Sequence, residues 1–153
     1  MSLSRLVYFS TSTLITKRNV AAELKHILTA SIRNNARLGI TGGLLFNRKY
    51  FVQVLEGDRT GLSDTFTRIC LDPRHTDVVL VESRVVSNRI FGAWSMGFAG
   101  RTDLFEQPSG RFFADGIFDP RPMTGDQLVD FTHEMVLQES KMVSGPVSSF
   151  IEV

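Results

Sequence analysis

The sequence predicts an α+β protein with a ferredoxin-like β-α-β-β-α-β order, an extra strand and a C-terminal helical cap. Three observations support this fold class. In the first hundred residues, β-rich runs alternate with two segments of helical apolar spacing, two of these runs flank a short polar turn, and a third amphipathic helix follows later. This is the order of the split βαβ motif, in which we expect the first and third strands to be central and adjacent.

The first strand and the first helix occupy the N-terminal forty residues. Residues 6–9 form a short β-rich run that ends in a Ser/Thr-rich turn. Asn19 is a suitable N-cap for the helix, because apolar residues recur after it at helical spacing. We expect this helix to end near Asn34 and Asn35, since Gly39 lies just beyond them.

The second and third strands are predicted to form a hairpin. Residues 43–46 and 50–55 are β-rich and flank the polar turn 47–49. A fourth strand is expected over residues 78–86 and a fifth over 94–98.

A second helix is predicted between the third and fourth strands. Leu62, Phe66 and Ile69 recur at i, i+4 and i+7. The helix should end at Asp72, because a residue that precedes proline avoids helical geometry.

The remaining residues, 101–153, differ from the first hundred because prolines and glycines interrupt them. Thr124 can cap a helix that runs to about Lys141. We therefore divide the chain into a domain of residues 1–100 and a C-terminal extension that packs on the open face of the sheet and has a loose end. The apolar stripe of the extension's helix consists of Leu128, Phe131, Met135 and Val136.

The composition excludes several classes of protein. Because 17 Lys and Arg face 16 Asp and Glu, the net charge of +1 gives no basic surface for nucleic acid. No apolar run approaches the ~20 residues of a membrane helix, and the first residues lack the apolar core of a signal peptide. A lone cysteine, Cys70, excludes an internal disulfide and suits a reducing cytosol, so a cytoplasmic location is expected.

Enzyme and metal motifs are also missing from the sequence. The glycine-rich stretch 39–43 has no P-loop lysine and precedes a strand rather than a helix. The three scattered histidines offer no metal-ligand spacing, and no nucleophile–base arrangement stands out. The residues alone therefore indicate a binding domain rather than an enzyme.

Polar side chains inside apolar segments are the candidate site residues. Tyr8 lies on the first strand and Gln53 inside the third, where a buried amide is costly unless it is hydrogen-bonded. They are either an ordinary half-buried pair or a phenol and an amide that meet across adjacent strands, depending on register. Asn34 and Asn35, close to Ser31, can grip a planar donor–acceptor edge, although asparagine is also common at helix ends.

The second helix offers charged candidates. Arg68 and Asp72 are four residues apart, so they form either a surface ion pair of little energetic value or part of a polar cluster that faces the first helix. His75 follows three residues later and is ordinarily a loop histidine.

Four stretches of the sequence, taken in order, resemble the motifs of a known protein family. They are residues 6–10, residues 34–42, residues 51–57, in which Gln53 is followed by Val-Leu-Glu-Gly, and residues 94–97. Together they resemble the BLUF family, the flavin-dependent blue-light sensors. The similarity covers about residues 4–100, and the family's ferredoxin-like fold agrees with the order of elements.

The resemblance implies FAD, bound non-covalently with its ring between the two helices. Tyr8 matches the photoactive tyrosine, which gives an electron and a proton, and Gln53 matches the switching glutamine. Trp94 and Met96 match the signalling strand; being two apart they should share one face, and which of them lies beside Gln53 stays open. Cofactor contacts are implied for Ser31, Asn34, Asn35, Gln53, Arg68, Asp72 and His75.

The implied function is that of a photoreceptor and not of an enzyme. Its signal should pass to a downstream protein or an oligomer interface, with self-association expected and with no nucleic-acid or membrane partner. The alternative is a ferredoxin-like module that binds another small molecule and regulates a partner without light chemistry. A hydrolase of the acylphosphatase kind would need an arginine-bearing phosphate loop, whereas residues 10–16 contain no arginine and no glycine.

Overall fold

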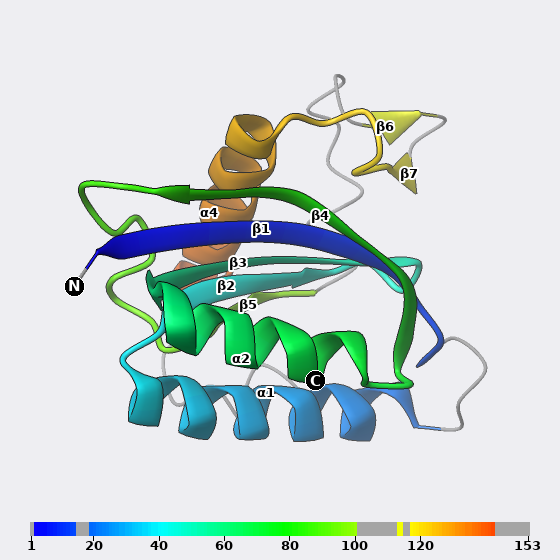
Figure 1. The fold of residues 1–153 in the computed structure, drawn as a ribbon. Helices are drawn as coiled ribbons and strands as arrows, with labels where there is room; N and C mark the ends of the chain where they lie inside the picture. The colour runs from blue at the N-terminus through cyan, green and yellow to red at the C-terminus, as the bar shows by residue number, and fades with distance from the viewer. Residues whose placement is uncertain (1, 15–18, 101–112, 115–116, 143–153) are drawn as a thin grey trace.

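The computed structural model describes residues 2–14, 19–100, 113–114 and 117–142. Its main sheet has five strands in the order β4-β1-β3-β2-β5, so β1 and β3 are adjacent in its interior, as predicted (Figure 1). Strands β6 and β7 form a separate two-stranded sheet. The bounds are β1 Leu3–Ser12, α1 Val20–Leu38, β2 Thr41–Phe46, β3 Tyr50–Asp58, α2 Arg59–Cys70, β4 His75–Val85, β5 Gly97–Ala99, β6 Phe113–Ala114, β7 Ile117–Phe118 and α4 Gly125–Met142.

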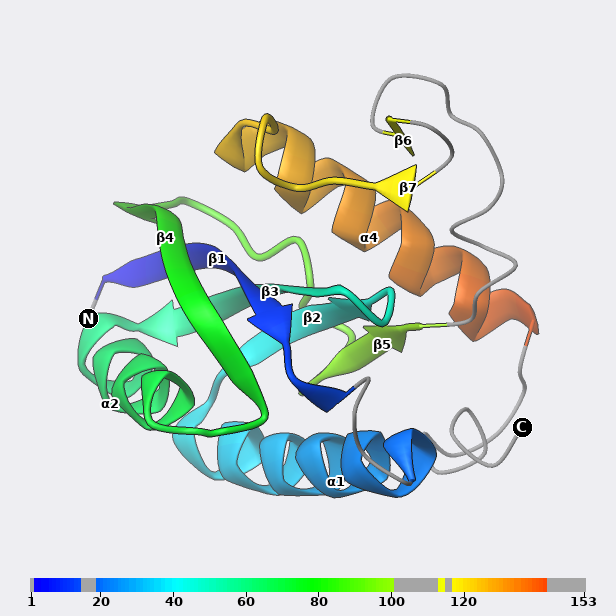
Figure 2. The ribbon, with the colours of Figure 1, turned by 90° about the vertical axis from the view of Figure 1, so that its right-hand side faces the viewer.

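The sheet lies between two helical layers. Figure 2 shows α1 and α2 on one face and α4 on the other. Strand β1 pairs antiparallel with β3 and β4, β2 pairs antiparallel with β3, and β2 pairs parallel with β5. The predicted β2–β3 hairpin is confirmed: Arg48 in its turn has φ 76°, and the Asn47 side chain accepts a hydrogen bond from Tyr50 N at 2.7 Å.

Helix α1 begins as predicted but ends later. The Asn19 side chain accepts a hydrogen bond from Ala22 N at 3.0 Å. The expected end at Asn34 and Asn35 is wrong, because α1 continues to Leu38. Gly39 then closes the helix with φ 68°, a left-handed conformation that glycine adopts at little cost. The two asparagines are therefore side chains within a helix and not its terminators.

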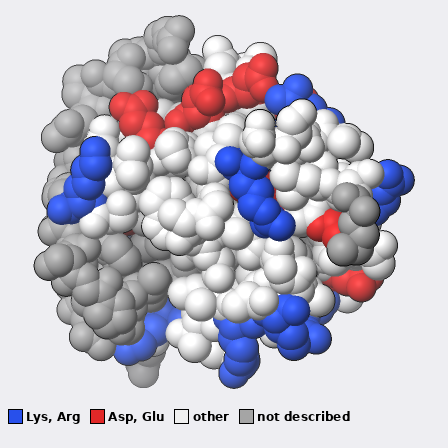
Figure 3. Space-filling view, turned by 90° about the vertical axis from the view of Figure 1, so that its left-hand side faces the viewer, with Lys and Arg blue, Asp and Glu red and all other residues white. Residues whose placement is uncertain are grey.

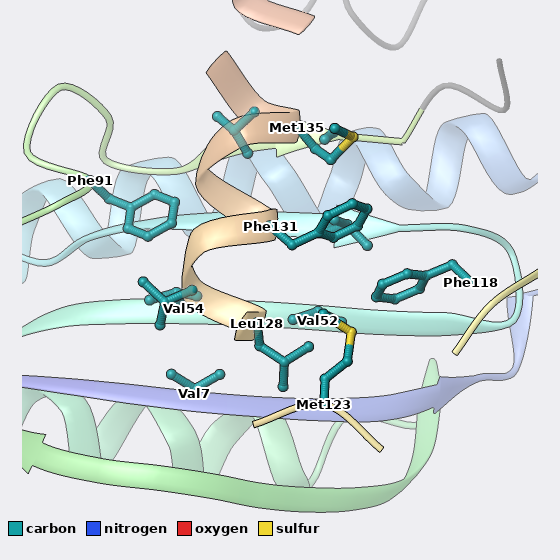
Figure 4. Packing of buried hydrophobic residues seen from close by; sticks show 13 residues of the cluster. Val7, Val52, Val54, Phe91, Phe118, Met123, Leu128, Phe131 and Met135 are labelled. Carbon is teal, nitrogen blue, oxygen red and sulfur yellow. The ribbon is translucent and has the colours of Figure 1, made fainter. Parts of the chain in front are cut away.

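Helix α4 covers the second face of the sheet, as predicted. Thr124 and Gln127 exchange hydrogen bonds between the side chain of each and the backbone N–H of the other, which is a capping box. Figure 4 shows Leu128, Phe131 and Met135 directed toward the sheet, where they join a buried cluster with residues of β1 and β3. The predicted loose end of the extension, and residues 101–112 before it, lie outside the described residues.

The fifth strand is shorter than expected. Strand β5 comprises only Gly97–Ala99, so Trp94 and Met96 precede it. Trp94 N donates to Phe91 O at 3.0 Å and Trp94 O accepts from Gly42 N at 3.1 Å. The first of these bonds closes a turn within the chain instead of a ladder between strands, and this turn shifts the start of the strand.

Charged side chains of both signs lie on the surface. On the face drawn in Figure 3, several acidic side chains lie along the upper edge and several basic ones along the lower edge, further charges of both signs are scattered between them, and much of the area is uncharged. This distribution agrees with the near balance of charges in the sequence.

Candidate functional site

A cleft opens between α1 and α2, over the sheet face that these helices cover. Its volume of about 170 Å³ is more than tenfold the ~10–15 Å³ that a single water needs, so it is large enough for a ligand. Tyr8 lines it, as do all seven residues for which the sequence implied cofactor contacts. Apolar side chains complete the lining, among them Ile27, Leu44 and Phe51.

Tyr8 and Gln53 meet at the floor of this cleft. They are direct partners in the β1–β3 register, and both are nearly inaccessible to solvent. The Tyr8 hydroxyl donates a hydrogen bond to Gln53 Oε1. Gln53 Nε2 in turn donates to Met96 Sδ at 3.6 Å. The register, which sequence left open, thus joins a phenol, an amide and a thioether in one chain of contacts.

The Tyr8 phenol is held in its neutral form. Burial raises its pKa well above the usual value of about 10, and the nearby Cys70 and Asp72 raise it further. The protonated hydroxyl donates to Gln53 Oε1 in this structure, and its oxygen keeps the capacity to accept a hydrogen bond.

The polar residues of α1 project into the cleft from within the helix. Asn35 is only 2% exposed, and its Nδ2 donates to Ser95 O at 2.8 Å. Asn34 and Ser31 are half-buried and line the same side of the cleft. Asn35 therefore ties α1 to the segment that carries Trp94 and Met96, a contact that the sequence did not indicate.

The charged rim of the cleft differs from the expected Arg68–Asp72 pair. Asp72 forms its ion pair with Arg74, at 2.6 Å, while Arg68 lines the cleft as an exposed side chain. Burial alone would raise the pKa of the Asp72 carboxyl, but hydrogen bonds from the Arg74 side chain and backbone hold it below its usual value. Arg74 also approaches His26 Nδ1 on α1 at 2.9 Å, and so bridges the mouth of the cleft.

Arg74 was not among the site residues predicted from the sequence. It follows Pro73, outside any helical periodicity. The turn-forming Asp-Pro-Arg order was the available signal, because a turn there directs the arginine back onto the aspartate.

His75 supports the Tyr8 side of the cleft. Its Nε2 donates to Ile69 O at 2.5 Å, since a carbonyl can only accept, and its Nδ1 accepts from the Ser10 hydroxyl at 2.8 Å. The ring lies edge-on to Tyr8, with 6.2 Å between ring centroids. His75 is therefore an ordered wall of the cleft and more than a loop residue.

One buried group in the cleft points to a ligand. Thr65 on α2 is 8% exposed, and its Oγ1 forms no hydrogen bond within the described part of the chain. A buried hydroxyl without a partner is costly, so a polar group in the cleft would satisfy it. A flavin ring is flat, apolar on its faces and polar along one edge, which fits a cleft with apolar walls and amides at one end.

Met96 and Trp94 lie on opposite faces of the sheet, so the expectation that they share one face is wrong. Met96 is buried in the cluster under α1 and α2, beside Gln53. Trp94 is half-buried and packs on the α4 side, with ring centroids 6.4 Å from Phe91 and 5.9 Å from His133. The turn before β5 breaks the two-residue alternation of a regular strand.

Other kinds of site find no support in the described residues. No group of three His, Cys, Asp or Glu side chains there is placed to hold a metal ion. No described helix combines the length and apolar character required to cross a bilayer.

The fold and the cleft define a small-molecule-binding domain of ferredoxin-like architecture. The sequence profile of the BLUF family, described as sensors of blue-light using FAD, matches residues 3–97. That match covers more than half of the chain, so this protein belongs to the BLUF family of blue-light sensors, which bind flavin.

The curated relatives are much longer proteins. The photoactivated adenylate cyclase subunit beta of Euglena longa is 38% identical over 96 residues, which are 62% of this chain and 11% of the relative. Subunit alpha of Euglena gracilis is 34% identical over 109 residues, 70% of this chain and 10% of the relative. The chain thus spans about a tenth of the relatives' length, and their cyclase activity does not transfer to it.

Solved structures match over nearly the whole chain. The dark-state structure of BlrB, a BLUF protein, is 32% identical with a TM-score of 0.72, and the match covers 90% of this chain and 96% of BlrB. The ground state of BlsA has a TM-score of 0.76 at 24% identity and covers 95% of this chain and 92% of BlsA, which establishes likeness of fold.

Proposed function

We propose that this protein is a blue-light photoreceptor that binds FAD non-covalently in the α1–α2 cleft and switches through Tyr8 and Gln53. The observation that carries the proposal is the hydrogen bond from the Tyr8 hydroxyl to Gln53 Oε1 at the floor of a ligand-sized cleft. A bound flavin supplies absorption of blue light and, once excited, a strong oxidant. Tyr8 is the electron donor in this proposal, and its proton already lies on the hydrogen bond to Gln53.

The cleft residues have distinct roles in binding. Asn35, Asn34 and Ser31 would hold the polar edge of the ring from α1, and a polar group of the cofactor would satisfy the Thr65 hydroxyl. Arg68 and Asp72 would contact the cofactor from α2 and the turn after it, and His75 from the wall beside Tyr8. Arg74, which contacts His26 across the mouth, would help to enclose the cofactor.

The Gln53 amide can switch without any backbone movement. Rotation by half a turn would direct Nε2 toward the Tyr8 oxygen, which can accept, and Oε1 toward Met96 Sδ. A thioether has no proton to donate, so the rotated state replaces an N–H···S contact with two acceptors facing each other. Met96 is therefore expected to move away when the amide rotates.

A displacement of Met96 can reach α4 through the neighbouring residues of the chain. Ser95 lies between Met96 and Trp94, and Trp94 contacts His133 of α4 across the sheet. We infer that residues 1–100 form the sensor and that the extension, 101–153, passes the signal to a downstream protein or to a second copy of the chain. Light should loosen residues 94–140 while the cleft stays closed. The exposed thiol of Cys70 suits the cytoplasm, where we place the protein.

The test is the absorbance spectrum of the purified protein before and after blue light. The protein should be yellow with releasable FAD and should show a reversible red shift. Tyr8→Phe should retain FAD and lose the shift, whereas Tyr50→Phe, the matched control away from the cleft, should keep both. A colourless protein without flavin affinity would instead favour a ligand-binding module without light chemistry.

A further inference from the structure

A buried carboxylate lies at the end of β3, on the sheet face opposite the cleft. Glu56 is 0% exposed and belongs to the same strand as Gln53. Its two oxygens accept hydrogen bonds from Ile90 N and Phe91 N, both at 2.8 Å. The light-sensing chemistry proposed above makes no use of this group, although a charge is expensive to bury without purpose.

The charge of Glu56 is compensated by Arg5. The Arg5 guanidinium contacts Glu56 Oε2 at 2.9 Å and also donates to Asn88 O at 3.0 Å. Charge-assisted hydrogen bonds are the stronger kind, and both ions are removed from water. Arg5 and Glu56 together therefore fix the backbone of residues 88–91 to the sheet.

Phe91, whose backbone Glu56 holds, contacts Trp94 directly. The Phe91 ring is fully buried between the sheet and α4 (Figure 4). It lies so close to Gly43 that a Cβ there would be 2.6 Å from a ring carbon. Phe91 O accepts from Trp94 N at 3.0 Å, and the Phe91 ring packs against the indole. The position of Trp94 is thus set from a residue that Glu56 holds.

A short segment connects Phe91 to β5. Gly92 and Ala93 are small, exposed residues between the fixed Phe91 and Trp94. Downstream, Gly97 pairs with β2. Within residues 92–96, Trp94 O accepts from Gly42 N and Ser95 O accepts from Asn35 Nδ2, while Glu56 holds the upstream end of the segment through Ile90 N and Phe91 N.

We propose that Glu56 is a positioning residue whose carboxylate, through the Phe91 backbone, keeps Trp94 against α4 in the dark. The importance of Trp94 for signalling rests on the proposed function, but its resting position does not. Glu56 thereby determines which of Trp94 and Met96 faces Gln53 before illumination.

The test uses the single tryptophan of the chain as its own reporter. In the flavin-loaded protein kept in the dark, acrylamide quenching of Trp94 fluorescence and hydrogen exchange of the Trp94 amide are measured. Glu56→Gln places an NH₂ group against a backbone N–H. Loss of one charge-assisted bond corresponds to roughly a tenfold rise in the open population, so exchange should become about tenfold faster and quenching should increase.

Two further variants separate positioning from general loosening. Glu56→Asp keeps the charge beside Arg5 but withdraws the carboxylate from the backbone, and it should act in the same direction if Glu56→Gln does not fold. Leu62→Ala removes a buried side chain on the other face of the sheet and should lower stability without exposing Trp94. Unchanged Trp94 readouts in both Glu56 variants, or an equal change in Leu62→Ala, would overturn the proposal. Neither readout requires a light response, so failure of the photocycle is a separate result.

Discussion

Replacement of Asn35 by alanine should weaken both the fold and the binding of FAD. The Asn35 side chain is 2% exposed and donates to Ser95 O at 2.8 Å. Its loss leaves that carbonyl without this donor, which typically costs about 1–3 kcal/mol. The same substitution removes an amide that we assign to the flavin's polar edge, so affinity should fall by about one to two decades.

The two effects can be measured separately. Urea unfolding of the flavin-free protein reports the bond to Ser95, and a fluorescence titration with FAD reports the contact with the cofactor. Asn34→Ala is the matched comparison, because Asn34 lines the same cleft but is more exposed than Asn35, so its loss should weaken FAD binding less. Equal affinities for wild type and Asn35→Ala, or equal losses in the two variants, would refute the reasoning.

Three other outcomes are expected. Because burial raises the pKa of Tyr8, the folded protein keeps the phenol protonated; the free energy of unfolding should therefore fall as the pH rises above ~10, the unfolded value, and Tyr8→Phe should reduce that decline in urea titrations. Leu128→Ala, fully buried under α4, should lower the free energy of unfolding by about 2–5 kcal/mol, whereas Gln138→Ala on the exposed side of α4 should change it by under ~0.5 kcal/mol. Met96→Ala should preserve the light-induced colour change but abolish the light-dependent change in hydrogen exchange of α4; an unaltered change in α4 would exclude Met96 from the route.

The arrangement of helices and strands could be predicted because it follows from apolar periodicity. The stripe of Leu128, Phe131 and Met135 predicted both α4 and the face it buries. The polar turn between β2 and β3 predicted the hairpin. These signals are local, and each is repeated several times within its segment.

Two details of the fold that the sequence analysis missed are the end of α1 and the turn before β5. Two turn-like asparagines suggested the end of α1, but Gly39 provides a cheaper left-handed cap four residues later. Strand alternation placed Trp94 and Met96 on one face, but the bond from Trp94 N to Phe91 O makes a turn there. Both features are short-range bonds, and apolar periodicity does not reveal which of the competing local bonds will form.

In the candidate site, the residues could be predicted from the sequence but their hydrogen-bond partners could not. The family resemblance was sufficient to predict that Tyr8, Gln53 and the α1 amides line one cleft. The partners of these residues were not foreseen: Asp72 pairs with Arg74, and Asn35 with Ser95 O. Which partner a polar side chain selects depends on distances of a few ångströms, and these follow from the packed fold.

If rotation or rearrangement of the Gln53 amide is the switch, a side chain without an amide at this position should abolish the colour change. The light-minus-dark absorbance spectrum is recorded for wild type and for Gln53→Leu, both loaded with FAD. Leucine keeps the bulk but has neither donor nor acceptor, so Gln53→Leu should bind flavin and show no red shift, while wild type shows a reversible one. A red shift of undiminished size in flavin-loaded Gln53→Leu would contradict the account.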